Sequence, residues 1–114
     1  TDLENTLKET HEFYASQEKR IAARLALLPK GSIRKKGIGG ETYFYLRFRK
    51  GEKIVDEYLG KEVPDGLKEK LGEREKLREE LNKIRQGLRL LNQTAQTISD
   101  LTETVRTLLS AFTR

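Results

Sequence analysis

The stretch GSIRKKGIGGETYFYLRFRKGEKIVDEYLG, residues 31–60, decides the fold. It contains three runs of strand-forming residues, at 31–36, 42–49 and 53–59, separated by two glycine-containing turns. The glycines between Gly37 and Glu41 suit the positive φ of a hairpin turn, whereas a phosphate-binding loop would continue into Lys-Ser/Thr and a helix. Two hairpins in succession predict a three-stranded antiparallel meander with one face that needs a cover.

Helical periodicity flanks the meander on both sides. Residues 3–28 place Leu7, Tyr14, Ile21 and Leu28 seven positions apart, which predicts an amphipathic helix. After residue 66 a second helical pattern runs to the end of the chain. We therefore predict an α+β fold made of an N-terminal helix in residues 1–30, a basic three-stranded β-meander in residues 31–62, and a long C-terminal heptad helix in residues 63–114.

The second helical pattern has the spacing of a coiled-coil seam. From Leu77 onward the apolar residues are four and three positions apart in alternation. One chain of this size cannot bury so long a seam, so we expect a homo-oligomer, a dimer or a tetramer. A turn around residues 92–94, with the end of the chain folding back, is the alternative to a continuous helix. The residues expected to mediate oligomerisation are Leu77, Leu81, Ile84, Leu88, Leu91, Ala95, Ile98, Val105, Leu109 and Phe112.

Composition argues against catalysis. The 114 residues include no Cys, no Met, no Trp and one His, His11. A disulfide framework, a thiolate metal site and a Cys nucleophile are therefore excluded, and we expect no enzyme activity, no metal and no cofactor. No apolar run reaches the roughly 18 residues that span a bilayer, and we expect no signal peptide. We therefore expect a cytoplasmic protein with no membrane partner.

Positive charge is concentrated in the middle of the chain. The net charge is +5, yet residues 29–53 alone carry eight Lys and Arg against two Asp and Glu. Residues 67–91 carry eight against five, whereas the remaining segments are neutral or acidic. A basic segment of this kind attracts phosphate backbones or acidic protein surfaces.

Strand alternation in residues 42–49 gives the clearest indication of function. One side of this strand carries Phe44, Leu46 and Phe48, which predicts a core face, while the other carries tyrosines and arginines. Aromatic rings and guanidinium planes stack on bases, and Arg and Lys bind phosphates or guanine edges. The predicted nucleic-acid-binding residues, with DNA as the first candidate, are Arg34, Lys35, Lys36, Tyr43, Tyr45, Arg47, Arg49, Lys50 and Lys53.

Two other interpretations stay open at this point. In the first, the chain is a coiled-coil adaptor or inhibitor whose sheet docks an acidic protein. In the second, the tyrosines and arginines are structural, and the arginines pair across the sheet with Asp56 or Glu57. The sequence does not discriminate DNA from RNA.

Three segments carry a resemblance to known domains: residues 28–36 (LPKGSIRKK), 43–51 (YFYLRFRKG) and 58–61 (YLGK). They resemble a group of small uncharacterised prokaryotic domains with a Pro-x-Gly-Ser start and a Tyr-rich basic hairpin, flanked by charged helices. Those domains often occur in mobile elements, which implies such a context here and no assigned activity. Residues 31–60 are also similar in architecture to the three-stranded arm-binding domains of phage-type integrases, which read DNA with a sheet.

Overall fold

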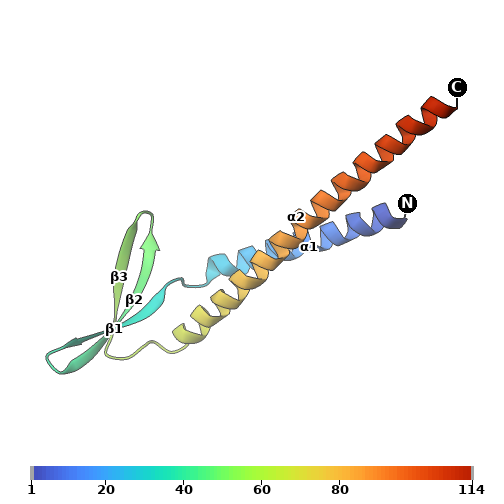
Figure 1. Ribbon diagram of the computed structural model, residues 1–114. Helices are drawn as coiled ribbons and strands as arrows, with labels where there is room; N and C mark the ends of the chain where they lie inside the picture. Colours follow the sequence, from blue (N-terminus) through green and yellow to red (C-terminus); the bar gives the residue numbers. More distant parts are fainter. Residues whose placement is uncertain (1, 114) are drawn as a thin grey trace. The chain divides into compact units, whose positions relative to one another are not determined.

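The computed structural model describes residues 2–113 and contains five elements in the predicted order of helix, three strands and helix (Figure 1). The α+β fold expected from the sequence is therefore confirmed. Residues 1 and 114, the outer ends of the two predicted helical segments, lie outside the described residues. The elements are α1 (Asp2–Leu27), β1 (Ser32–Ile38), β2 (Glu41–Lys50), β3 (Lys53–Gly60) and α2 (Leu67–Phe112).

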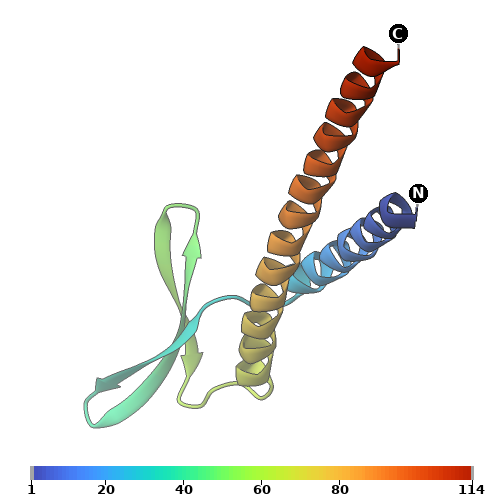
Figure 2. The ribbon, with the colours of Figure 1, turned by 45° about the vertical axis from the view of Figure 1, so that its right-hand side comes forward.

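The long helix α2 is continuous. It spans 46 residues and passes through residues 92–94 without a turn (Figure 2). The alternative in which the end of the chain folds back is therefore wrong. Residues 92–98 contain no Pro and no Gly to end the helix, and the Thr97 hydroxyl donates to the helical carbonyl of Gln93 at 3.0 Å.

The three strands form an antiparallel sheet in the order β1-β2-β3. The first hairpin pairs Ile38 with Glu41 around Gly39 and Gly40, whose φ angles are +61° and +83°. Two successive positive φ values are what a type I′ turn requires, so these glycines are explained by the turn. The second hairpin pairs Lys50 with Lys53 around a loop that begins at Gly51, where φ is +65°.

The described residues pack as two compact units, which cut across the helices. Residues 2–22 and 80–113 form the helical unit, and residues 23–79 form the sheet unit. Each unit therefore has its own small core.

In the sheet unit, the apolar side of β2 lies beside the segment that follows α1. Leu46 and Leu28 are both buried, and Leu46, Phe48, Leu25 and Leu28 line one shallow groove. Polar contacts join the neighbouring helix ends: the Arg24 guanidinium donates two hydrogen bonds to Glu73, at 2.9 and 3.0 Å. The Arg24 hydrogen bond lowers the pKa of the Glu73 carboxyl.

In the helical unit, α1 lies against α2 of its own chain. Ile21 and Leu81 are the buried residues of this unit, with 1% and 6% of their surfaces exposed. Arg85 donates to Glu18 at 3.2 Å beside them. Within residues 2–113, no helix combines the length and the apolar character needed to cross a membrane.

Candidate nucleic-acid interface

The register of the sheet brings six of the nine predicted binding residues onto one face. Residues directly opposite each other in an antiparallel pair share a side of the sheet. Lys36 lies opposite Tyr43, and Arg34 lies opposite Tyr45. Alternation along β2 then adds Arg47 and Arg49 to the same side. We call this surface the tyrosine–arginine face; it contains Arg34, Lys36, Tyr43, Tyr45, Arg47 and Arg49.

The other three predicted residues occupy different positions. Lys35 pairs with Phe44, which belongs to the apolar side of β2. Lys50 and Lys53 pair with each other at the second hairpin turn, in the same alternation as Phe44. All three side chains are exposed, but the strand alternation puts them on the other side of the sheet from the tyrosine–arginine face.

Register also adds two residues that the sequence analysis did not include in the site. Asp56 lies opposite Arg47, and Tyr58 lies opposite Tyr45. Counting outward from the two-residue turn at Gly51 and Glu52 would have found both, because each step along β2 moves one step back along β3. The one-residue shift between Phe44 and Tyr45 comes beyond these pairs and does not disturb them.

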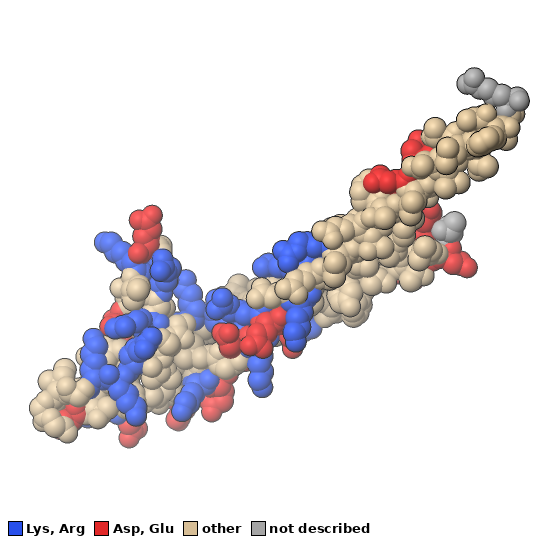
Figure 3. Space-filling model, viewed as in Figure 1, with Lys and Arg blue, Asp and Glu red and all other residues tan. Residues whose placement is uncertain are grey.

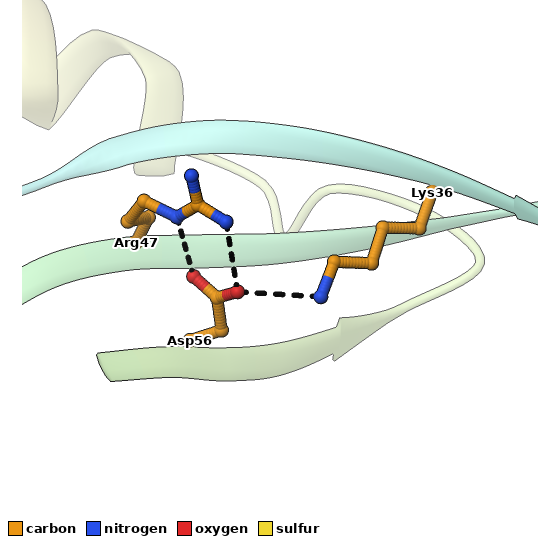
Figure 4. Close-up of polar contacts among 3 residues, drawn as sticks. All are labelled: Lys36, Arg47 and Asp56. Atoms are coloured by element: carbon orange, nitrogen blue, oxygen red, sulfur yellow. Dashed lines mark hydrogen bonds and ion pairs between the residues drawn. The ribbon is translucent and has the colours of Figure 1, made fainter. Parts of the chain in front are cut away.

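The Asp56 carboxylate binds two cations of the face at once (Figure 4). Arg47 donates through Nε to Oδ1 at 2.8 Å and through Nη2 to Oδ2 at 3.1 Å. Lys36 donates through Nζ to Oδ2 at 3.3 Å. The hydrogen bond from Arg47, aided by Lys36, lowers the pKa of Asp56 to about 2. The carboxylate is thus ionised at neutral pH and neutralises part of the charge of the face.

Aromatic rings fill the space beside this cluster. The Tyr45 and Tyr58 ring centroids are 5.4 Å apart, and those of Tyr43 and Tyr58 are 6.2 Å apart. The Lys36 ammonium lies 4.5 Å from the centroid of the Tyr45 ring, a cation–π distance. Tyr58 remains 57% exposed, so its ring is available to a ligand on the tyrosine–arginine face.

A second acidic residue lies at the end of the face. The Tyr43 hydroxyl donates to Glu41 at 2.8 Å, and Lys61 pairs with the same carboxylate at 2.9 Å. Lys61 and Tyr43 both lower the pKa of Glu41, and the hydrogen bond to Glu41 raises the pKa of Tyr43. The Tyr43 hydroxyl is therefore already engaged within the sheet.

Two arginines of the face have no such restraint. Within residues 2–113, neither Arg34 nor Arg49 makes a side-chain hydrogen bond or ion pair, and both are exposed. Lys and Arg gather over the sheet in the view of Figure 3. The cations on this face that are best placed to bind an incoming anion are therefore Arg34 and Arg49.

The groups on the tyrosine–arginine face are guanidinium, ammonium and phenol groups, which donate hydrogen bonds and stack. No group of three or more His, Asp or Glu side chains in residues 2–113 comes together in a way that could hold a metal ion. Asp56 and Glu57 pair with Arg47 and Leu46 respectively, on opposite sides of the sheet, and so cannot work together as an acid and a base.

The fold and this surface define a small α+β protein whose three-stranded sheet presents arginines and tyrosines on one side. The chain belongs to the family described as Domain of unknown function (DUF6788), which matches residues 2–69. That match covers α1, the whole sheet and the first residues of α2. No curated protein and no solved structure matches the chain.

Proposed function

We propose that the protein binds nucleic acid, with duplex DNA as the first candidate, through the tyrosine–arginine face of its sheet. Self-association of the helices would hold more than one sheet together. The observation that carries the proposal is the strand register, which gathers four cations and two tyrosines on one exposed side.

The two arginines without partners are assigned the first contacts. A guanidinium binds a phosphate or a guanine edge with two parallel hydrogen bonds, and Arg34 and Arg49 have these donors unused within the described chain. An antiparallel ribbon is narrow enough to enter a DNA major groove. Lys35, Lys50 and Lys53 alternate onto the other side of the sheet, so we assign them no contact through this face.

The tyrosines are assigned a contact of a different kind. The exposed Tyr58 ring and its neighbour Tyr45 offer an apolar surface to a sugar or an unpaired base. Asp56 opposes binding, because its carboxylate repels phosphate and occupies Arg47 and Lys36. We assign it the role of limiting non-specific affinity.

The test is to titrate labelled duplex DNA, single-stranded DNA and RNA with the protein and to follow fluorescence anisotropy. The titrations are repeated from about 50 to 200 mM salt, because the affinity of phosphate contacts falls with salt over this range. We expect Arg34→Ala with Arg49→Ala to weaken binding by at least about tenfold and to lower the salt slope by about 2. Lys83→Ala with Arg89→Ala is the matched control, because it removes the same charge from exposed, unpaired positions on α2.

A substitution that is expected to strengthen binding tests whether the tyrosine–arginine face, rather than net charge, is responsible. Asp56→Asn should raise the affinity and the salt slope, since it releases Arg47 and Lys36 for phosphate. Glu57→Gln makes the same change of charge one residue away on the opposite side of the sheet, and should have a smaller effect. Equal effects of the two variants would show that net charge, rather than this face, governs binding.

Failure of the wild-type protein to bind any of the three nucleic acids, even at low salt, would overturn the proposal. The same arginines would then point to the adaptor interpretation, in which the sheet docks an acidic protein surface.

A further inference from the structure

The end of α2 exposes a stripe of large apolar side chains. Every residue from 99 to 113 is exposed, including Leu101, Leu108 and Phe112 at 61%, 55% and 85%. Positions four and three residues apart lie on one side of a helix, so these residues form one continuous strip. We call it the C-terminal stripe; it consists of Leu101, Val105, Leu108, Leu109 and Phe112.

The same helical unit contains a groove that the chain itself does not fill. This helical groove has a volume of about 670 Å³ between α1 and α2, and Leu7, His11, Leu91, Ala95 and Ile98 contribute to its walls. Ala95 falls at a seam position of the heptad pattern, yet it is exposed. A small side chain at a seam position leaves a hole for a larger side chain from a neighbouring helix.

The low charge and the apolar spacing of the C-terminal stripe favour a second copy of this chain as its partner. Residues 99–113 carry only Asp100, Glu103 and Arg106 as charged groups, so charge does not direct this surface to a strongly acidic or basic partner. The groove is lined by charges of both signs, among them Lys8, Glu12 and Arg106, so neither surface carries a strong net charge that would repel a second copy. The apolar spacing of the stripe also continues the spacing with which α2 packs on α1 around Leu81, which suits another helix of the same chain.

We propose that the C-terminal stripe of one copy packs into the helical groove of a second copy, and reciprocally, to form a two-fold symmetric dimer. Both halves of the contact are present on every chain, so two reciprocal contacts close the assembly and leave no unfilled copy of either surface. The inference specifies the self-association in the proposed function and does not depend on nucleic-acid binding.

The first seam residues are excluded from this dimer contact. Leu81 is buried in its own chain, and Ile84 and Leu88 are half-buried there and do not line the groove. Of the residues predicted to mediate oligomerisation, the proposal thus retains Leu91, Ala95 and Ile98 as groove positions and Val105, Leu109 and Phe112 as stripe positions.

The oligomeric state of the full chain tests the proposal by sedimentation equilibrium. We expect a dimer for the wild type and a monomer for Leu101→Asp with Leu108→Asp. Because both leucines are exposed within the single chain, this variant should keep its helical circular dichroism. Ser110→Asp places an acid on the same turns of the helix away from the stripe, and should remain dimeric. A monomeric wild type, or an assembly larger than a dimer, overturns the proposal.

Disulfide trapping tests the reciprocal seating. The natural chain has no Cys, so every disulfide reports an introduced pair. We expect an equimolar mixture of Ala95→Cys and Leu108→Cys chains to form the mixed disulfide in excess over either self-disulfide. A preference for the Leu108→Cys self-disulfide would mean that the stripes of two copies pack on each other. That result would overturn the proposed packing of the stripe into the helical groove. A monomer that still binds nucleic acid would overturn this inference and the proposed self-association, but would leave the proposed binding through the tyrosine–arginine face intact.

Discussion

Gly31 is the residue at which the path of the chain into the sheet is most tightly constrained. Its φ is +126°, a conformation that residues with a Cβ rarely adopt. A Cβ built there would lie 2.5 Å from the Arg47 carbonyl oxygen and 3.1 Å from side-chain atoms of Leu46 and Phe48. The chain therefore enters β1 in direct contact with the centre of β2, and only glycine fits.

We expect Gly31→Ala to lower the free energy of unfolding by about 1–3 kcal/mol through backbone strain alone. The clash of the new Cβ with the Arg47 carbonyl oxygen should add to this loss. Chemical denaturation followed by circular dichroism measures it. Gly37→Ala is the matched control in the same strand, since its φ is ordinary and the nearest atom to its Cβ would be 4.0 Å away. Equal stability of the two variants would contradict the close approach at Gly31.

At the scale of the elements, Asp56 joins all three strands of the sheet. It lies on β3, and its carboxylate binds Arg47 of β2 and Lys36 of β1. Because these cations lower the pKa of Asp56, the ionised form is favoured in the folded chain over the unfolded one. A carboxyl group whose pKa is lower in the folded chain stabilises the fold fully when the pH is above the pKa of the unfolded state. That stabilisation is lost as the pH falls through the pKa of the folded state.

We therefore expect the stability of the sheet to fall between the ordinary Asp pKa of about 3.9 and the folded value of about 2. Denaturation midpoints measured across this range should decline less steeply for Asp56→Asn than for the wild type. The decline should not vanish, because the pKa values of Glu41 and Glu73 are lowered too. Parallel profiles for the two proteins would contradict the role of Asp56.

At the scale of the whole molecule, self-association would multiply the affinity of a single sheet. A dimer that presents two tyrosine–arginine faces would be able to bind a long duplex twice, and the second contact would be effectively intramolecular. We expect Leu101→Asp with Leu108→Asp to weaken binding to a duplex of several helical turns by at least about tenfold. A duplex of about one turn, which has room for one sheet, should show little change. Equal losses on both duplexes would contradict an avidity effect.

Much of the architecture could be predicted because it rests on local physics. Glycines at 39, 40 and 51 turn the chain, alternation from Tyr43 to Arg49 separates an apolar side from a polar one, and heptad spacing specifies a helix through residue 112. These signals act between residues close in sequence, where backbone conformation and side-chain periodicity are enough. Nucleic-acid binding and the mobile-element context stay predictions.

Contacts between distant residues had to come from the folded chain. The pairing of Arg47 with Asp56 follows from strand register, and it separates the two engaged cations from Arg34 and Arg49. Likewise, periodicity shows that Leu81 and Leu109 share a seam, but only packing against α1 buries the first while the second stays exposed. Local sequence sets which side of an element is apolar, whereas the choice of partner for that side is made by the free energy of packing the whole chain.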